Sequence, residues 1–327
     1  MNTALPADEE DLQFSAEVPE TLAGSRLDVA CAKLFDAYSR SRLQQWIAGG
    51  RLQVDGQTVT AVRTPVTAGS LLLLDAEPEP DTEVKPQDLP LEIVHQDAAL
   101  AIIHKPAGLT VHPGAGQRAS TLQNALLYHL PQTAAVPRAG IIHRLDKDTS
   151  GLLVVALTLS AHARLVAQLA AREIRREYDA VVQGSLVAGG TVEAPIGRHP
   201  RDRLKMAVLD RGGREATTHY RVHAHFGHHT HLRVRLETGR THQIRVHMAH
   251  LRHSIVGDSV YGGEAVRGQG LPDSLRAALK AFPRQALHAR ELALAHPLSG
   301  KPLEITREPP ADMQALLALL REQDPRR

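Results

Sequence analysis

The chain has 327 residues, more than one average domain, so two domains are expected. Hydrophobic residues make up 43% and charged residues 23% of it, as in a soluble protein with a sizeable core. The single cysteine, Cys31, excludes an internal disulfide and a cysteine-based zinc site, and it fits a reducing compartment. The longest apolar runs, residues 71–74 and 151–159, are too short to span a bilayer. These features predict a cytoplasmic protein with no membrane partner.

The net charge of +2 hides a separation of charge along the chain. Residues 1–20 carry six acidic and no Lys or Arg residues, the reverse of a signal or transit peptide. Residues 21–75 carry six basic and four acidic residues, and residues 91–327 carry 31 basic and 21 acidic residues. Two basic parts favour a polyanionic partner, most commonly nucleic acid, although an ordinary basic enzyme explains the charge equally well.

The domain boundary is predicted from a stretch rich in proline and acid. Residues 77–90 contain four prolines and five acidic residues. Proline removes backbone donors and like charges repel, so this composition is typical of an extended linker. We therefore expect a flexible acidic N-terminus at residues 1–14, a small domain at 15–75, a linker at 76–90 and a large domain at 91–327.

The small domain is expected to contain two short helices and a small sheet. Residues 26–35 place apolar side chains at helical spacing, and residues 39–47 predict a second helix that ends at a pair of glycines. Alternation of apolar residues over 52–59, around a central Asp-Gly, indicates a hairpin. Residues 71–74 supply a last strand.

The motifs of this small domain resemble those of the S4 RNA-binding domain. They are Arg26-Leu-Asp28, Ser39-Arg-Ser-Arg42 and Gly50-Arg-Leu-Gln-Val-Asp-Gly56. The S4 family usually has Asn-Gly at the hairpin, and the Asp-Gly found here keeps the turn chemistry. The resemblance implies contacts with RNA phosphates, although a solvated helix face is the alternative. The candidate phosphate contacts are Arg26, Arg40, Arg42 and Arg51.

The large domain is expected to be α+β. Strand-like runs occur at residues 91–94, 100–103, 151–157, 178–182, 217–222 and 230–236. Helices are expected at 121–130 and 160–172; Ser160 is the expected cap of the second, with Leu165, Val166 and Leu169 facing inward. Because both hairpins and helices join the strands, a mixed, largely antiparallel sheet flanked by helices fits best.

The most informative stretch reads Gly140-Ile-Ile-His-Arg-Leu-Asp-Lys-Asp-Thr-Ser-Gly151. Asp146 comes just before an apolar run that predicts a buried strand. A carboxylate there can be held at the rim of a rigid sheet while its oxygens face a cleft. Position alone favours an ordinary turn aspartate, but Asp148 and the residues after it are better suited to making the turn.

The same stretch begins a series of motifs that resemble one enzyme family. His143-Arg-Leu-Asp146, followed by Thr149-Ser-Gly151, is similar to the signature of RNA pseudouridine synthases of the RluA subfamily. Further matches follow in the family's order, and the likeness covers nearly all of residues 91–305. They are Lys105-Pro-Ala-Gly-Leu-Thr-Val-His-Pro113, Arg176-Glu-Tyr178-Asp-Ala-Val and Leu236-Glu-Thr-Gly-Arg-Thr-His-Gln-Ile-Arg-Val-His-Met248.

The resemblance implies the isomerisation of uridine within RNA. The glycosidic bond to N1 is broken, the uracil rotates, and a bond to C5 is made, with no cofactor. One carboxylate can begin this by attacking the sugar carbon or the base, or by removing the ribose 2′ hydrogen; the sequence does not choose between them. No metal is expected, because the histidines between His219 and His253 lack metalloprotease spacing and cysteine partners.

The resemblance also implies roles for residues around the catalytic carboxylate of Asp146. Arg245 would pair with it through its planar fork, with a plain strand position and a phosphate contact as the alternative. Tyr178 would pack on the target base, with a core tyrosine as the alternative. Arg144 would fill the stack that the extruded uridine vacates, and Ile244 would pack under the base.

Four more residues of these motifs are candidates for binding RNA. They are Lys105, His143, Arg240 and His242. Structural roles are an equal alternative for the two histidines.

The target implied by the resemblance is large-subunit ribosomal RNA, at the helix 69 stem-loop of 23S rRNA, modified by a monomeric enzyme. Other ribosomal or transfer RNA uridines are the alternative within the class. A non-catalytic RNA-binding factor for ribosome assembly is the alternative outside it. The joint presence of Asp146, Tyr178 and Arg245 disfavours that factor, because pure binding of a polyanion needs no carboxylate.

Overall fold

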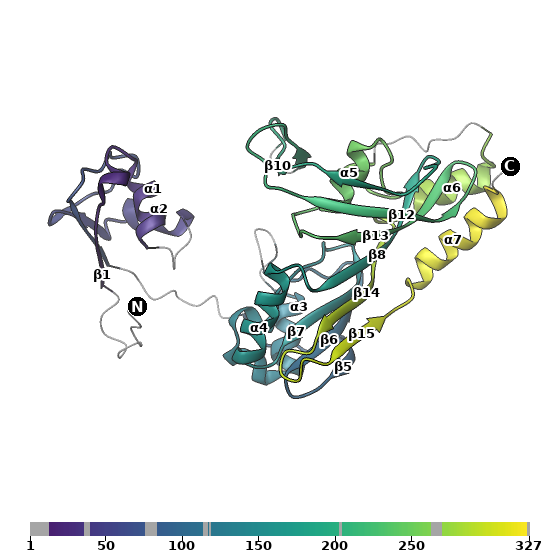
Figure 1. Cartoon of the computed structure of the whole chain (residues 1–327), viewed down its shortest axis with the longest axis horizontal. Coiled ribbons are helices and arrows are strands. Elements are labelled where there is room, and N and C mark those ends of the chain that lie inside the picture. The colour runs from purple at the N-terminus through teal and green to yellow at the C-terminus, as the bar shows by residue number, and fades with distance from the viewer. Residues whose placement is uncertain are drawn as a thin grey trace. The chain divides into compact units, whose positions relative to one another are not determined.

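The structure is a computed structural model. It describes residues 13–35, 40–75, 84–113, 117, 119–202, 205–262 and 270–325. Most of the expected acidic N-terminus (residues 1–12) and much of the expected linker (76–83) lie outside this part. The chain divides into two compact units, one within residues 1–83 and the other within 84–327 (Figure 1).

The small unit is a four-stranded antiparallel sheet with two helices, in the strand order β1-β4-β2-β3. Its elements are β1 (Gln13–Glu17), a 3-10 turn (Glu20–Leu22), α1 (Leu27–Leu34), α2 (Arg40–Ala48), β2 (Leu52–Val54), β3 (Gln57–Thr58) and β4 (Leu71–Asp75). The helices and the hairpin are confirmed. Asp55 and Gly56 have φ values of 51° and 80°, the left-handed backbone that a two-residue hairpin turn requires.

β1 is the element of the small unit that the sequence analysis missed. It pairs with β4 over its whole length, from Gln13 opposite Asp75 to Glu17 opposite Leu71. The strand therefore begins inside the stretch expected to be a flexible tail. Its acidic surroundings concealed it, because the strand is specified by its partner rather than by its own composition.

The small unit has its own hydrophobic core. α1 contributes Leu27, Ala30 and Cys31, and α2 contributes Leu43 and Ile47, all fully buried. Burial raises the pKa of the Cys31 thiol to about 12, so this cysteine is an inert part of the core.

Asp28 is a carboxylate in this core, with no exposed surface. It accepts hydrogen bonds from Arg26 (Nε, 2.9 Å), Arg40 (Nη2, 2.7 Å) and Gln44 (Nε2, 2.6 Å). Burial alone would raise the pKa of Asp28, but these donors and the charge of Arg26 lower it to about 2. The acid thus ties the start of α1 to α2.

The large unit is built on a nine-stranded mixed sheet in the order β5-β6-β7-β14-β8-β13-β12-β9, with β15 paired to β14. The strands are β5 (Glu92–Gln96), β6 (Leu100–Lys105), β7 (Ser150–Ala156), β8 (Arg175–Gln183), β9 (Gly190–Glu193), β12 (Thr217–His225), β13 (His229–Leu236), β14 (Leu287–Ala295) and β15 (Pro302–Thr306). β10 (Ile196–Arg198) and β11 (Met206–Val208) form a separate hairpin. Within the nine-stranded sheet, the β7–β14 pair is parallel and the other pairs are antiparallel, which confirms the expected fold class.

Helices flank this sheet (Figure 1). They are α3 (Leu122–His129), α4 (Leu159–Ala170), α5 (Gln243–His250), α6 (Asp273–Ala281) and α7 (Ala311–Gln323), with 3-10 turns at Pro131–Ala135 and Pro137–Gly140. Among the described residues, no helix is both long and apolar enough to cross a membrane.

Two details of α4 differ from the prediction. Thr158, not Ser160, caps the helix, because its hydroxyl accepts a hydrogen bond from the backbone N–H of Ala161. Val166 was expected to face inward but is 41% exposed, whereas Leu165 is fully buried. Leu165 and Leu169, four residues apart, share the face that packs on the core, whereas the adjacent Val166 is turned away from Leu165 by about 100° around the helix axis.

β7 and β14 lie unusually close at Gly151. A Cβ on Gly151, which has a φ of +126°, would lie 2.3 Å from the backbone oxygen of Ala289. All seven residues of β7 are buried, as its apolar run predicted. The first residues of β7, which follow the Asp146 loop, are therefore packed tightly against β14.

Candidate active site

Asp146 lies in the loop that enters β7. Its backbone oxygen accepts a hydrogen bond from the N–H of Thr149 at 3.1 Å, which makes the turn. Its side chain is 18% exposed, and its Oδ2 accepts a hydrogen bond from Nη1 of Arg245 at 3.1 Å. The structure thus brings together the two residues that the sequence analysis expected to pair, and the carboxylate remains reachable from outside.

Arg245 comes from α5, and a second carboxylate holds it in place. Asp258 accepts hydrogen bonds from Nε at 2.7 Å and from Nη2 at 2.9 Å. Burial alone would lower the pKa of Arg245, but Asp258 and Asp146 raise it above its usual range. The strand position considered for Arg245 is wrong, since α5 projects it toward Asp146. One edge of the guanidinium, Nε and Nη2, is fixed by Asp258, and Nη1 is left for Asp146.

Asp258 is itself saturated with donors. It is 3% exposed, and its Oδ1 also accepts the backbone N–H groups of Val260 and Tyr261 at 3.0 Å each. Burial would raise the pKa of Asp258, but the hydrogen bonds and charge of Arg245 outweigh it and lower the pKa. The acid is therefore a fixed anchor for Arg245.

Tyr178 stands beside this pair on β8. It is 5% exposed and lines a small pocket of about 60 Å³ together with Asp146, Arg245, Ile244 and Leu236. Burial raises the pKa of its hydroxyl; the charge of Arg176 lowers it and that of Asp146 raises it further. The ring stays neutral near pH 7 and offers an apolar wall close to the carboxylate.

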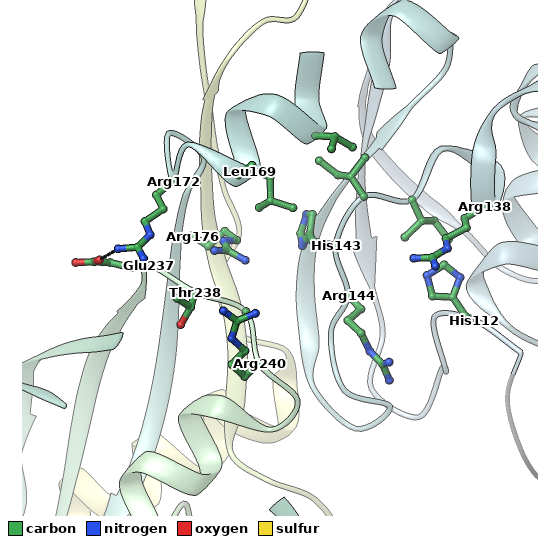
Figure 2. A pocket seen from close by; sticks show the side chains of 15 residues that line it. His112, Arg138, His143, Arg144, Leu169, Arg172, Arg176, Glu237, Thr238 and Arg240 are labelled. Carbon is green, nitrogen blue, oxygen red and sulfur yellow. Dashed lines mark hydrogen bonds and ion pairs between the residues drawn. The ribbon is translucent and has the colours of Figure 1, made fainter. Parts of the chain in front are cut away.

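A larger cleft of about 560 Å³ adjoins this pocket. Arginines dominate its lining: Arg138, Arg144, Arg172, Arg176 and Arg240. The one acid among its lining residues, Glu237, accepts hydrogen bonds from Arg172 at 2.6 Å and from His219 at 2.7 Å. Figure 2 shows the basic side chains gathered around this space. The cleft and the small pocket share Arg144, Arg176 and Arg240, so a strongly positive surface leads to Asp146.

Two residues next to Asp146 take different places. Arg144 is exposed and projects into the cleft (Figure 2). His143 lines the same cleft and is partly exposed, but its Nε2 is held by the fold, since it accepts the backbone N–H of Val154 at 3.2 Å. Burial lowers the pKa of His143 to about 3, and the charge of Arg176 adds to this. His143 is therefore a neutral residue that braces the loop against β7.

His242 and Arg240 flank the start of α5. His242 has a left-handed backbone, with a φ of 57°, and its Nδ1 lies 2.8 Å from the hydroxyl of Tyr261. Arg240 donates from Nε to the backbone oxygen of Glu215 at 2.9 Å. Both residues line the small pocket, so they remain candidates for contact with RNA.

Lys105 is a correction to the expected RNA-binding residues. It has no exposed surface, and its Nζ donates to the backbone oxygens of Pro106 (2.7 Å), Leu109 (2.9 Å) and Lys147 (2.9 Å). Burial lowers its pKa to about 7, against the opposing charges of Asp148 and Asp146. The side chain cannot reach RNA; it joins the loop after β6 to the loop that carries Asp146.

The four arginines expected to bind phosphate in the small unit already have partners. Arg26 and Arg40 bind Asp28, yet they are 44% and 50% exposed. Arg42 lies over the ring of Trp46 at 4.7 Å, and Arg51 is 3.4 Å from Asp75. Arg26 and Arg40 keep part of each guanidinium at the surface, so binding of phosphate by them stays a prediction.

Sequence reasoning missed three residues of the site. Asp258 and Tyr261 lie in a turn whose local sequence does not reveal that it faces Asp146. Arg176 lines both the pocket and the cleft but was read only as part of the motif of Tyr178. Its position two residues before Tyr178 on the same strand was the available signal, because alternate residues share a face. Among the described residues, no group of three or more His, Cys, Asp or Glu side chains could hold a metal ion.

An aspartate paired with an arginine, beside a buried tyrosine and below a basic cleft, is the arrangement expected of an RNA-modifying enzyme that uses its own carboxylate. Residues 99–250 match the family model of RNA pseudouridylate synthases, and residues 25–72 match the S4 domain. The chain belongs to the RNA pseudouridine synthase family and is an RNA-modifying isomerase.

Individual relatives extend this similarity over most of the chain. Ribosomal large subunit pseudouridine synthase D of Xanthomonas campestris is 53% identical over 311 residues, which are 95% of this chain and 93% of that protein. The protein of the same name from Escherichia coli K12 is 50% identical over 310 residues, 95% of each chain. Among solved structures, human RNA pseudouridylate synthase domain containing 4 has a TM-score of 0.54 and 25% identity, covering 70% of this chain and 92% of that one.

Proposed function

We propose that this enzyme converts uridines of large-subunit ribosomal RNA to pseudouridine, with the helix 69 stem-loop of 23S rRNA as its substrate. The names of the relatives support the ribosomal target. The observation that carries the chemistry is the carboxylate of Asp146, held by Arg245 where a basic cleft meets a small pocket. On this proposal the enzyme acts as a monomer in the cytoplasm of a bacterium.

Asp146 is the proposed catalytic carboxylate. Arg245 engages Oδ2, while Oδ1 has no hydrogen bond from any residue that the structure describes. The free oxygen can attack C1′ of the ribose or the base, or remove the 2′ hydrogen. On each route the C1′–N1 bond breaks, a C1′–C5 bond forms, and the C5 hydrogen is lost as a proton while N1 gains one.

The walls of the small pocket are proposed to hold the uracil during this rearrangement. Tyr178 and Ile244 are nearly fully buried and present apolar surface beside Asp146. Stacking on an aromatic ring contributes about 1–3 kcal/mol per base, which keeps a detached uracil in place while it rotates. Arg144, exposed at the mouth, is placed to fill the stack that the extruded uridine leaves.

The replacement Asp146→Asn tests this proposal. It removes the ionised oxygens with little change of shape, so we expect tritium release from C5-labelled helix 69 RNA to fall at least about 1,000-fold. Filter-binding affinity for the same RNA is expected to change less than about threefold, because the phosphate contacts remain.

Asp148→Asn is the matched control, an acid two residues further along the same loop, and it should release tritium at nearly the wild-type rate. Undiminished release by Asp146→Asn would rule the catalytic role out. Mapping of pseudouridines in ribosomal and transfer RNA with and without the protein tests the target. If every pseudouridine that depends on the protein lies outside helix 69, the helix 69 assignment is wrong.

A further inference from the structure

Arg176 is a buried charge without a counterpart. The residue is 6% exposed, yet no hydrogen bond or ion pair joins its guanidinium to another residue that the structure describes. Its Nε is fully enclosed and has no hydrogen-bond partner. A buried arginine is normally paired, because burial of an uncompensated charge is strongly unfavourable.

The other two buried arginines of the described chain show how this pairing is usually met. Arg245 binds Asp258 and Asp146. Arg284 donates to Asp312 at 2.7 and 2.9 Å and to backbone oxygens. Arg176 therefore differs from both, because no counter-charge for it lies among the residues that the structure describes.

The open side of Arg176 faces the site. Arg176 and Tyr178 alternate on β8, so their side chains leave the same face of the sheet about 7 Å apart. Arg176 lines both the pocket of Asp146 and the basic cleft, and Figure 2 shows it among the cleft residues, with His143 to one side and Arg240 below it. A Cβ on Gly239 would come within 3.1 Å of its Nη1, so the absence of a side chain at Gly239 leaves room beside the guanidinium.

The charges around Arg176 select an anion. Arg144 and Arg240 line the same two spaces. Glu237, the acid of the cleft, is already bound to Arg172 and His219. The buried cation thus sits in a positive field, next to the pocket where the uracil is proposed to bind.

We propose that Arg176 binds a backbone phosphate of the RNA beside the extruded uridine. This inference rests on the proposed function and names a contact of the same site. The planar guanidinium can donate two parallel N–H groups to phosphate oxygens, and the separation from Tyr178 is of the order of one extended nucleotide. An incoming phosphate supplies the missing counter-charge. The unfavourable free energy of the unpaired buried charge in the free enzyme is therefore relieved when RNA binds.

Arg176→Gln separates this role from a structural one. Because the change removes an unpaired buried charge, the melting temperature is expected to stay the same or rise, whereas kcat/KM for the helix 69 stem-loop falls about 10- to 100-fold. Arg175→Gln is the matched control on the same strand, where the side chain is 43% exposed and bound to Glu291 and Glu304; it should leave kcat/KM within about twofold. A lower melting temperature with unchanged kcat/KM would show a structural residue and overturn the proposal.

Stem-loops with a single neutral methylphosphonate on either side of the target uridine test the ligand directly. With wild-type enzyme, one of the two linkages should lower kcat/KM about as much as Arg176→Gln does. With Arg176→Gln enzyme, the same linkage should lower kcat/KM by less than a further factor of about two, because the contact is already lost. If each methylphosphonate lowers kcat/KM of the variant by the same factor as that of the wild type, Arg176 contacts neither phosphate and the proposal is contradicted. If, in addition, inorganic phosphate raises the melting temperature of the wild type but not of the variant, the site binds a free anion instead of RNA.

RNA binding distinguishes a failure of this inference from a failure of the proposed function. One phosphate contact fewer should reduce the slope of log affinity against log salt by about 0.7 for Arg176→Gln. If the wild type releases no tritium but Arg176→Gln still lowers the salt slope, the phosphate site stands and the isomerase assignment fails. An active wild type whose salt slope is unaffected by Arg176→Gln keeps the isomerase and loses the phosphate site.

Discussion

The two units of the molecule each place an aspartate against arginine, with opposite results. In the small unit, Asp28 has no exposed surface and its oxygens are saturated by two arginines and Gln44. In the large unit, Asp146 is 18% exposed and receives one hydrogen bond from Arg245. Pairing with arginine therefore does not by itself mark a reactive site. The free oxygen and its access to a cleft distinguish the carboxylate that can react from the one that holds helices together.

The candidate active site contains both kinds of carboxylate, one on each side of Arg245. Asp258 resembles Asp28, since it is buried and accepts several hydrogen bonds. Its role is to fix the guanidinium so that a single N–H group meets Asp146. The comparison predicts that loss of a saturated carboxylate mainly lowers stability or misplaces its arginine. Loss of the open carboxylate should instead lower the rate of the chemical step.

The largest effect on stability is expected from Asp28→Asn. The change weakens the charged hydrogen bonds that join α1 to α2, and because Arg26 and Arg40 are half exposed and stay solvated, the expected cost is about 1.5–3 kcal/mol. Native-state hydrogen exchange of the full chain should show α1 and α2 opening more easily by about this free energy. Asp75→Asn, at an exposed pair, is the control and should change the same amides by less than about 1 kcal/mol. Unchanged exchange in α1 and α2 would show that the saturated carboxylate is not what stabilises this unit.

A smaller effect, mainly on turnover, is expected from Asp258→Asn. Arg245 keeps its charge but loses the bidentate partner that orients it, so kcat should fall about 10- to 100-fold. RNA affinity should be nearly unchanged, because Asp258 is not at the surface of the cleft. Single-turnover kinetics and filter binding separate the two quantities, with Asp273→Asn in the first turn of α6 as the control. A loss of affinity that matches the loss of kcat would argue against positioning.

The smallest effect is expected on the pH dependence of stability, from His288. This residue extends the comparison to a buried titratable group in the sheet, away from the site. His288 is fully buried; its Nδ1 is 3.0 Å from Ser150 Oγ, and its Nε2 is 3.2 Å from the backbone oxygen of Arg307. Burial lowers its pKa from 6.5 to about 4. Between these values the unfolded chain binds a proton that the folded protein excludes, so stability falls as pH decreases through this range and is unaffected above it.

The measurement is the free energy of unfolding of the large unit at pH 7 and pH 5. His288 contributes about 2 kcal/mol to the loss of stability on acidification, and His288→Gln should be less sensitive to pH by that amount. His250→Gln, at an exposed position of α5, is the control. Equal pH dependence of wild type and His288→Gln would contradict the assignment of this proton.

Local signals predicted much of the fold. The Asp-Gly pair identified the hairpin of the small unit because few other residues accept its left-handed backbone. The apolar run after Asp146 identified β7 because a strand buried on both faces has no polar alternation. The features that were missed depend on distant partners. β1 is a strand because β4 pairs with it, and the cap of α4 moved by two residues because Thr158 could reach a free backbone N–H.

The same distinction applies to the site. Asp146, Tyr178 and Arg245 were found through motif resemblance, and the structure places them around one pocket. Asp258 and Arg176 were not found, because their importance lies in what their side chains do or do not contact across the fold. Lys105 was misassigned for the same reason. A lysine in a motif suggests binding of a phosphate, and only its three backbone acceptors reveal an internal tie.

The position of β14 has a consequence for how the enzyme is made. Asp146 precedes β7 and Tyr178 lies on β8, but β14, from residues 287–295, separates these two strands in the sheet. During synthesis, the amino-terminal unit can fold on its own, whereas the two halves of the candidate catalytic centre are joined only after a strand translated more than a hundred residues later. A nascent chain that has not yet released this strand from the exit tunnel can therefore carry a folded S4 unit while its candidate catalytic centre is still incomplete.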